Sequence, residues 1–538
     1  MYNEGVQKGR TPFFVFPLIR KLMVLMKTRS NLHFKALTSQ QVVLFPSNIG
    51  DRISLDHPVR IVNQVVDSLN IDDILSGYKG GGTSSFHPRM LIKVLFYSYF
   101  CNIYSCRKMA RALQENIHFM WLSGNSTPDF RTINDFRGKR LKDKIQHLFA
   151  ELVRLMADLG YVSLDIQYVD GTKLESASNR YTFVWKGSTE KNKTKLDEKI
   201  TRVLADIDSS IKQDKAELSS PVKQKAPVNS AELKSRIEEL NNRLAELNKP
   251  QKKAVRELER EALPRLKKYE QQLETLGTRN SYSKTDVDAT FMRMKEDHMK
   301  NGQLKPAYNT QISTENQFIT NFSIHQRAGD TATLTLHLEQ FKAYYDKQSK
   351  KVVADSGYGS EQNYKWMEDN GIEAFVKYNY FHKEQKRVFK KNIYHASNLP
   401  YDVPGDFYIC PAGKRMINIG ESERVSELGY KSKVSYYKTH SCEGCPLREM
   451  CYKGDGDRKI EVNHTLRAFK EKVRQKLLSE EGIRLRKNRA IEPEAVFGQL
   501  KSNNRFNRFR LRTLPKVNVE FGLAAIAHNL RKMVAKAA

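Results

Sequence analysis

Three acidic residues, Asp170, Asp355 and Glu494, have the residue type and the setting that metal-dependent phosphodiester chemistry requires. Asp170 follows the stretch YVSLDIQYV, and Asp355 ends KVVAD. Strands disfavour Asp, and an unpaired buried charge is costly, so an acid at either position needs a reason. Carboxylates that converge from separate elements are ligands that Mg²⁺ prefers, and two such ions can drive phosphodiester hydrolysis and transfer.

The two aspartates also have a purely structural interpretation. Asp170-Gly171 and Asp355-Ser356-Gly357 are both turn signals, so either aspartate could simply end a strand. The residues alone leave both interpretations open.

Glu494 lies in a strongly basic segment, RAIEPEAVFGQLKSNNRFNRFRLRTL, residues 489–514. Lys501 follows Glu494 by seven residues, or two turns of an α-helix, so the two side chains are expected on one helix face. Glu492 is the neighbouring candidate. Glu494 is preferred because it keeps six residues between itself and Lys501.

The arginines that follow would suit a phosphate backbone. Those predicted to contact it are Arg505, Arg508, Arg510 and Arg512. Phe506 and Phe509 lie among them and could stack on bases, but packing in a core is the preferred interpretation.

Four of the six cysteines are grouped. Cys442 and Cys445 form a C-x2-C pair, Cys451 follows, and Cys410 lies upstream. This grouping is typical of a structural zinc site, which would let a loop-rich region fold without a large core. Four free thiols without a metal remain the alternative.

Other residues bear on the cysteine prediction. His440 or His464 could replace one of the four zinc ligands. Cys101 and Cys106 fall in apolar helices and are expected to be buried thiols.

The secondary structure that must position these residues is predicted to change at Gly160, from mainly helices to a mixture of strands and helices. Beyond Gly160, strands and helices are predicted in an order that gives a mixed α/β sheet. The predicted strands are 161–176, two within 308–328, 351–357 and 372–378; the predicted helices are 331–347, 361–371 and about 485–535.

Residues 50–160 are predicted to be mainly helical. Two of these helices, 87–103 and 105–124, are joined by a tight break, with Arg107, Lys108 and Arg111 on the second. The arrangement suits a helix-turn-helix-like DNA reader, and a plain helical bundle with a basic face fits equally well.

Residues 189–278 have a coiled-coil pattern. Apolar residues from Leu233 to Leu247 step by four and three, and the steps resume from Leu266 to Leu276. The pattern predicts two antiparallel helices, and the break at Pro250 favours an intramolecular hairpin over a dimer contact. Residues 219–230, SSPVKQKAPVNS, are expected to be a flexible joint.

Composition limits the partners. Lys and Arg number 91 against 61 Asp and Glu, a net charge of +30. An excess this large favours a polyanionic partner, usually nucleic acid, although a basic ribosome-associated factor is the plainer alternative.

Neither a membrane nor an oxidising compartment is indicated. No apolar run approaches the roughly 18 residues of a membrane span, and six cysteines do not make a disulfide scaffold. Residues 12–25 resemble a signal peptide only faintly, because Arg20 and Lys21 interrupt them. We therefore expect a cytoplasmic, nucleoid-associated protein with a poorly structured leader, in which Met26 is an alternative start.

Taken together, the motifs resemble the DDE transposases of bacterial insertion sequences. YVDGTKLESASNRYTFVW (168–185) is similar to the family's first-Asp strand, and VVADSGYGSEQNY (352–364) to its second. R-x4-E-x6-K, FRLRTL and AAIAHNLRKM (524–533) are similar to its Glu region, and 88–99 and 127–137 to its N-terminal helices. The resemblance covers roughly residues 45–535. The Tyr that many relatives carry before the Arg is missing from EGIRLRKN, residues 481–488.

The resemblance implies a mechanism. Asp170, Asp355 and Glu494 would hold Mg²⁺ or Mn²⁺, and Arg489 and Lys501 would hold DNA phosphates near the scissile bond. Water would free a 3′ hydroxyl at the element's end, and that hydroxyl would attack target DNA. The implied partners are double-stranded DNA, both terminal inverted repeats and target, and a second copy of the chain as a homodimer.

The predicted organisation is α/β, with an RNase H-like mixed-sheet core in three pieces: 159–188 with the first Asp, 281–379 with the second, and 484–538 with the Glu. A coiled-coil hairpin (189–280) and a Cys-rich, zinc-binding insertion (380–483) interrupt this core. A leader (1–45) and an all-α DNA-binding domain (46–158) precede it. The rival hypotheses are an RNase H-like nuclease without strand transfer and a DNA-binding relative without activity.

Overall fold

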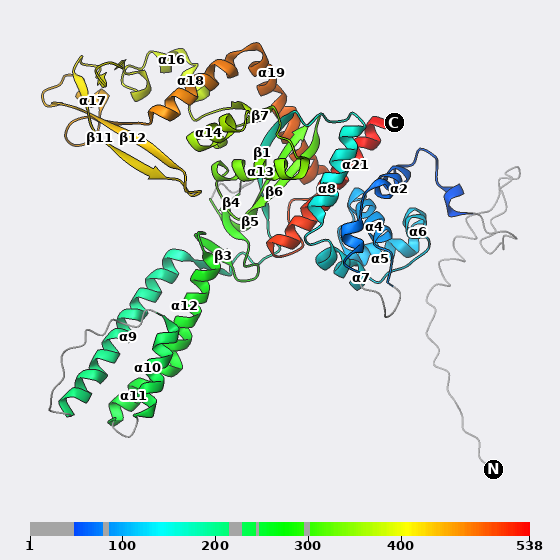
Figure 1. Ribbon diagram of the computed structural model, residues 1–538, viewed down its shortest axis with the longest axis horizontal. Helices are drawn as coiled ribbons and strands as arrows, with labels where there is room; N and C mark the ends of the chain where they lie inside the picture. Colours follow the sequence, from blue (N-terminus) through cyan, green and yellow to red (C-terminus); the bar gives the residue numbers. More distant parts are fainter. Residues whose placement is uncertain (1–47, 79–84, 215–228, 244–246, 295–301, 538) are drawn as a thin grey trace, which may run out of the picture. The chain divides into compact units, whose positions relative to one another are not determined.

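The computed structural model describes residues 48–78, 85–214, 229–243, 247–294 and 302–537 (Figure 1). The predicted leader, Met26 and most of the joint at 219–230 lie outside these residues. The chain divides after Arg52, and the described part of the first unit contains one short helix, η1 (Ile49–Arg52). All elements below belong to the second unit, Ile53–Ala538.

Helices form the region before residue 160, which confirms that prediction. They are α2 (Pro58–Ser68), α3 (Asp72–Leu75), α4 (Pro88–Phe100), α5 (Cys106–Glu115), α6 (Ile117–Ser123), α7 (Phe130–Asp135), the π-helical turn η2 (Phe136–Arg140) and α8 (Ile145–Asp158). His57 and His87 cap α2 and α4, each of which begins with a proline. Helix α4 is largely buried and packs on α2, α6 and the last helix, α21 (Leu514–Ala537).

A six-stranded mixed sheet lies at the centre of the second unit, and the prediction of such a sheet is confirmed. Its strands are β1 (Ile166–Glu175), β4 (Thr290–Arg293), β5 (Leu304–Glu315), β6 (Phe318–His325), β7 (Lys351–Ala354) and β8 (Glu373–Val376). Their order is β4-β5-β1-β7-β8, and β6 also pairs with β5. Strand β5 is antiparallel to β1, β4 and β6, whereas β7 and β8 run parallel to β1.

Helices cover the parallel strands. Helix α13 (Leu334–Tyr345) joins β6 to β7, and α14 (Glu361–Asp369) joins β7 to β8. Helices α18 (His464–Leu478) and α19 (Glu480–Arg489) pack on β8, and α19 also on β7. One apolar cluster combines these elements; it includes Val169, Val353, Val376, Leu338, Met367 and Val473. The strands that carry Asp170 and Asp355 are therefore held in a large, continuous core.

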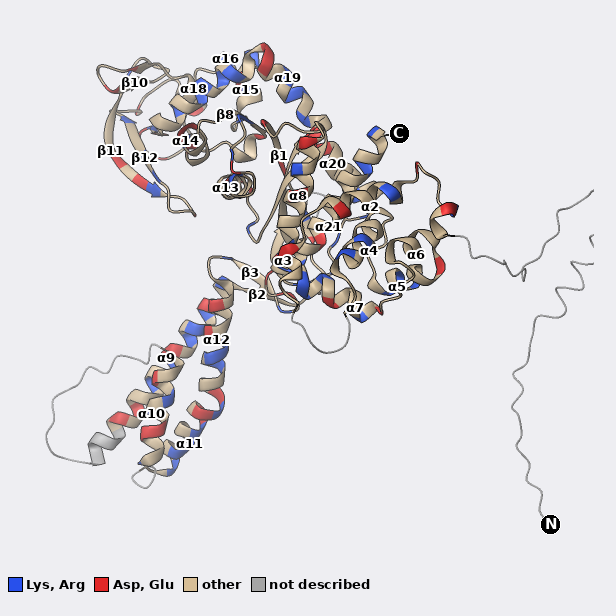
Figure 2. Ribbon diagram, turned by 45° about the vertical axis from the view of Figure 1, so that its right-hand side comes forward, with Lys and Arg blue, Asp and Glu red and all other residues tan. Residues whose placement is uncertain are grey.

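A helical region separates β2 (Phe183–Trp185) from β3 (Ser281–Ser283), and these two strands pair with each other. It contains α9 (Lys186–Asp214), α10 (Ser230–Asn242), α11 (Lys249–Glu257), the π-helical turn η4 (Leu258–Ala262) and α12 (Leu263–Leu276). Leu233, Ile237 and Leu240 pack inside this region, so its apolar steps serve an intramolecular core. The prediction of two helices was too simple, because α9 and α11 also pack within the bundle. Figure 2 shows acidic and basic residues interspersed along its helices.

A second, five-stranded antiparallel sheet lies between α14 and α18 in sequence. Its strands are β9 (Tyr401–Asp402), β10 (Phe407–Ile409), β11 (Arg415–Val425), β12 (Lys431–Thr439) and β13 (Lys459–Val462), in the order β13-β12-β11-β10-β9. Short helices accompany it: α15 (Phe381–Glu384), α16 (Arg387–Lys390), η7 (Ala396–Asn398) and α17 (Arg448–Cys451). Its apolar cluster is small and centres on Tyr408, Met416 and Tyr437.

The prediction of a single C-terminal helix from about 485 to 535 is wrong. After α19 come the π-helical turn η8 (Ala490–Glu494), α20 (Ala495–Gly498), a second π-helical turn η9 (Gln499–Asn503) and a non-helical segment before α21. Pro493 lies inside η8 and lacks the N–H that a regular helix needs. Because π turns change the number of residues per turn, the two-turn argument for Glu494 and Lys501 does not apply. In the part of the chain that the structure describes, no helix is long and apolar enough to cross a membrane.

Candidate active site

Asp170 lies inside strand β1, opposite Ile312 of β5, so it is not a turn residue. The side chain is 9% exposed, and its Oδ1 lies 3.0 Å from Nη2 of Arg489. Turn η8, which follows Arg489 directly, packs on both β1 and β5. This packing brings the start of the basic segment 489–514 to the middle of β1.

Asp355 follows β7 and serves two purposes at once. Its Oδ1 accepts a hydrogen bond from the Gly357 amide at 2.9 Å, which caps the short helix η6 (Ser356–Tyr358). Its Oδ2 lies 3.6 Å from Nη2 of Arg489. The next turn is tight, because a Cβ on Gly359 would lie 2.4 Å from the Lys377 carbonyl oxygen. A glycine at 359 thus lets the Asp355 loop lie directly against the end of β8.

Glu494 completes the group. Its Oε1 lies 2.8 Å from Nη1 of Arg489, and its side chain is half-exposed. The structure therefore brings all three predicted carboxylates around one guanidinium. Glu492, the rejected neighbour, accepts hydrogen bonds from the Thr314 hydroxyl at 3.0 Å and the Gln317 amide at 2.8 Å. Burial raises its pKa, and its contacts hold the turn between β5 and β6.

Arg489 lies among the carboxylates, whereas the sequence placed it beside DNA. The side chain is only 10% exposed, and its Nε has no hydrogen-bond partner among the described residues. One cation shared by three acids offsets their mutual repulsion. As the side chains stand, no group of three or more His, Cys, Asp or Glu within the described residues is arranged to hold a metal ion.

A buried polar network under the carboxylates was missed from the sequence. Asp330 accepts hydrogen bonds from Asn309 at 2.7 Å and Gln311 at 3.2 Å, and the Tyr358 hydroxyl donates to Gln311. Burial raises the pKa of Tyr358, and the nearby charges of Asp330, Asp170 and Asp355 add to the shift. The available signal was the two-residue spacing of Asn309 and Gln311 in a predicted strand, since residues at that spacing share one face.

Lys377 is a second missed residue, directly after β8. Burial lowers its pKa, Arg489 lowers it further, and Asp355 and Glu494 oppose the shift. With Ser356 and Lys383 it lines an open cavity. The sequence could have pointed to Lys377, because it lies near the end of the predicted strand 372–378. The carboxyl ends of the parallel strands β1, β7 and β8 share one edge of the sheet.

The predicted backbone-contacting arginines have structural contacts of their own. Arg508 donates to the carbonyls of Ser176 and Ser178, both at 3.1 Å, and Arg512 to that of Ala177 at 2.8 Å. Together they hold the segment that follows β1.

Other residues of the same basic segment differ in exposure. The Arg510 guanidinium lies 4.3 Å from the centre of the Tyr104 ring. Arg505 is exposed, and Lys501 is half-buried. Phe506 and Phe509 are 1% exposed, which confirms that they pack in a core.

The N-terminal basic residues lie on the exposed face of α5. Arg107 stacks over Phe130 at 4.8 Å, Arg111 pairs with Glu115 at 2.8 Å, and Lys108 is exposed. The prediction that Cys101 is buried is wrong, because α4 ends at Phe100 and leaves this residue exposed. Cys106, in contrast, is buried as predicted.

The four grouped cysteines line one pocket. His440 and His464 are not among the residues that line it. The ring of His464 packs against Tyr401, and its Nε2 lies 2.8 Å from the Tyr437 hydroxyl.

Two family models match the chain. The Transposase DDE domain matches residues 409–534, which include Arg489, Glu494 and the four cysteines but neither Asp170 nor Asp355. The Transposase domain (DUF772) matches residues 47–139, the N-terminal helices. No curated protein and no solved structure matches the chain. The two domain matches, in the order that the sequence motifs predicted, support an insertion-sequence DDE transposase.

Proposed function

We propose that this transposase binds the ends of its element and cuts and rejoins DNA at a centre formed by Asp170, Asp355 and Glu494. One observation carries the proposal. Three acids from separate segments of the chain, none adjacent in sequence, lie within 3.6 Å of a single guanidinium. Structural ion pairs seldom gather three carboxylates, whereas a divalent-cation site is built from hard oxygen ligands of this kind.

The topology of the sheet supports an RNase H-like core. Strands β6, β5 and β1 run antiparallel in a row, and β7 and β8 continue parallel to β1. In this arrangement Asp170 lies on the central strand and Asp355 at the end of its parallel neighbour. Two acids on adjacent strands thus face the same edge of the sheet.

The donor set suits Mg²⁺ or Mn²⁺, which enzymes of this family generally use to transfer nucleotidyl groups. All three side chains offer hard carboxylate oxygens, and they already share one cationic partner. A divalent cation held by Asp170, Asp355 and Glu494 would activate the attacking oxygen and stabilise the leaving oxygen. Arg489 holds the three carboxylates together, while Lys377 at the same edge of the sheet offers a phosphate a positive charge.

DNA is the proposed partner, bound as terminal inverted repeats and as target. The net charge of +30 supports a polyanion, and exposed cations lie on α5 (Arg107 and Lys108) and in the basic segment 489–514 (Arg505). We propose a homodimer on paired ends in the cytoplasm, at the nucleoid.

The test is cleavage of DNA that carries the native flanks of the reading frame, with Mg²⁺ or Mn²⁺. Wild type is compared with Asp170→Ala, Asp355→Ala and Glu494→Ala. The matched control is Asp165→Asn, which removes an exposed acid paired with Lys350 at 2.8 Å. We expect metal-dependent nicking at a fixed flank position, joined products, and loss of both in the three variants only.

Other outcomes would favour the rival hypotheses. Nicking without joined products would indicate a nuclease. Specific DNA binding by wild type without any cleavage would indicate a DNA-binding relative and would overturn the proposal.

A further inference from the structure

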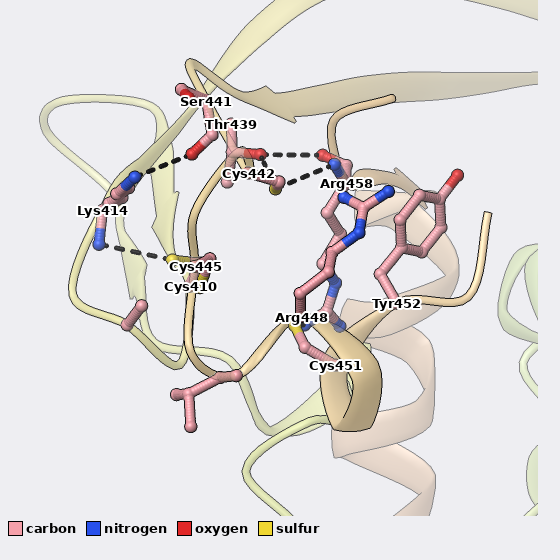
Figure 3. Close-up of a pocket in the computed structure, with 12 residues that line it drawn as sticks. Cys410, Lys414, Thr439, Ser441, Cys442, Cys445, Arg448, Cys451, Tyr452 and Arg458 are labelled. Atoms are coloured by element: carbon pink, nitrogen blue, oxygen red, sulfur yellow. Dashed lines mark hydrogen bonds between the residues drawn. The ribbon is translucent and has the colours of Figure 1, made fainter. Parts of the chain in front are cut away.

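We propose that Cys410, Cys442, Cys445 and Cys451 form a structural zinc site with four thiolate ligands. All four are free thiols, and all four line one small pocket (Figure 3). They come from three segments: Cys410 follows β10, Cys442 and Cys445 follow β12, and Cys451 ends α17. Chance placement of free cysteines would not bring all four to one cavity.

Hydrogen-bond donors already point at the sulfurs. The Sγ of Cys410 accepts from the Lys414 amide at 3.3 Å, and that of Cys442 from the Arg458 amide at 3.3 Å. The Sγ of Cys451 accepts from Nη1 of Arg458 at 2.9 Å. Zinc-bound sulfurs carry negative charge and accept hydrogen bonds of this kind. These donors also act as the outer contacts that orient metal ligands.

The charge around the pocket matches an anionic metal centre. Four thiolates and one Zn²⁺ carry a net negative charge, and Lys414, Arg448 and Arg458 line the same cavity (Figure 3). Arg458 is only 5% exposed, so its charge needs a nearby counter-charge. Without thiolates, three cations would surround a pocket whose remaining wall includes Ala412 and Leu447.

The local turns direct the chain around this pocket. Gly413 and Gly444 both have positive φ, +79° and +65°, in the sequences CPAGK and CEGC. In the first turn the Gly413 amide donates to the Cys410 carbonyl at 2.9 Å, and in the second the Cys445 amide donates to the Cys442 carbonyl at 3.4 Å. Each turn thus reverses the chain beside a cysteine, and glycine adopts that backbone without strain.

The thiol ligand set selects the metal. Soft thiolates favour Zn²⁺ over Mg²⁺, and no histidine lines the pocket, so a Cys₄ set fits better than one with His440 or His464. The sulfurs are not yet arranged to hold an ion, as noted for all described residues, so binding must draw them closer together. The free energy of zinc binding would stabilise the second sheet, which has few buried apolar side chains of its own.

The experiment measures zinc in the full-length chain, purified without chelator. We expect one zinc per chain, and Co²⁺ in its place should give the absorption bands of a tetrahedral thiolate site. Cys442→Ser and Cys445→Ser should each lower the zinc content at least about 10-fold. Cys101→Ser, an exposed cysteine outside the pocket, is the matched control and should keep it, as should Asp170→Ala.

A second measurement guards against variants that fail to fold. In wild type, zinc should protect the four pocket cysteines, but not Cys101, from alkylation mapped by mass spectrometry. Equal zinc content in Cys442→Ser and Cys101→Ser would overturn the proposal. So would wild-type chain without zinc, equal alkylation of the pocket cysteines before and after zinc is removed with a chelator, or a disulfide between pocket cysteines.

Discussion

The carboxylate centre and the cysteine pocket solve the same problem in different ways. Each collects chemically active side chains from three segments of the chain, and each places an arginine beside them, Arg489 in one and Arg458 in the other. Asp170 lies on a strand and Asp355 directly after one, both beside the large apolar cluster around Val169 and Val353. The cysteines lie on turns beside a sheet with only six residues in its buried cluster.

The difference indicates what each site needs from a ligand. Packing fixes the backbone at Asp170 and Asp355, so a bound ion adds chemistry without building the fold. In the cysteine pocket the backbone has little packing to hold it, so a bound ion would add stability. Five predictions test this contrast, from the largest expected effect to the smallest.

Asp170→Asn should abolish catalysis without unfolding the chain. We expect cleavage to fall more than about 100-fold, because residues that merely orient metal ligands already cost 10- to 100-fold. The melting temperature should stay close to that of wild type, since Arg489 keeps Asp355 and Glu494 as partners. Cleavage assays and calorimetry on the same preparation give both values, and a large loss of stability would break the contrast.

Arg489→Met should destabilise the chain by about 3 kcal/mol, because it leaves the buried Asp170 carboxylate without its cation. Mg²⁺ should raise the melting temperature of this variant more than that of wild type, since the ion replaces the lost charge. Chemical denaturation with and without Mg²⁺ measures both effects. Equal responses to Mg²⁺ would argue that the carboxylates bind no ion.

Removal of zinc with a strong chelator should loosen the second sheet and spare the first. We expect a loss of roughly 3 kcal/mol, the value for a ligand at about 100 times its dissociation constant. Limited proteolysis should then cut between residues 399 and 462 while residues 166–175 stay protected. Uniform loss of protection in both sheets would remove the distinction between the two regions.

Glu492→Gln should cost about 1–2 kcal/mol of stability, because its carboxylate accepts hydrogen bonds from Thr314 and Gln317. Its cleavage rate should change only a few-fold. Glu494→Gln should do the reverse, with normal stability and no cleavage. If Glu492→Gln alone lost activity, the assignment of the third acid would be reversed.

Mild acid should weaken the core through two buried histidines. Burial lowers the pKa of His337 to about 3 and that of His528 to about 4, from 6.5. The folded state thus binds fewer protons than the unfolded state below pH 6.5, so stability is full above that pH and falls as pH drops toward 4. Each histidine contributes up to about 1.4 kcal/mol per pH unit. Denaturation at pH 7.5 and 5.5 measures the loss, and His528→Gln should reduce it.

Local features of the structure could be predicted from the sequence. Asp170 and Asp355 stand out because each interrupts or ends an apolar strand, and the helical N-terminal region follows from its periodicity. The convergence of three acids on Arg489 could not be predicted, because that contact depends on η8 packing against β1 and β5. The prediction that Glu494 and Lys501 lie on one helix face assumed the spacing of an ideal α-helix. The π turns η8, which contains Pro493, and η9 change that spacing.

Hydrogen bonds from side chains to backbone carbonyls could not be predicted from the sequence either. Arg508 and Arg512 look like free cations in the sequence, yet they bind carbonyls of residues 176–178, which any residue type supplies. Asp330 and Gln311 meet through neighbouring strands and loops, so neither residue signals the other.

The pairing of β2 with β3 makes the helical region between them a replaceable module. Trp185 pairs with Ser281, and the Lys186 amide donates to the Asn280 carbonyl at 2.9 Å, so the chain leaves and returns at one point. A two-residue turn could join these strands directly. Evolution or an engineer could therefore shorten, lengthen or exchange the region between residues 186 and 280 while the sheet that carries Asp170 stays as it is.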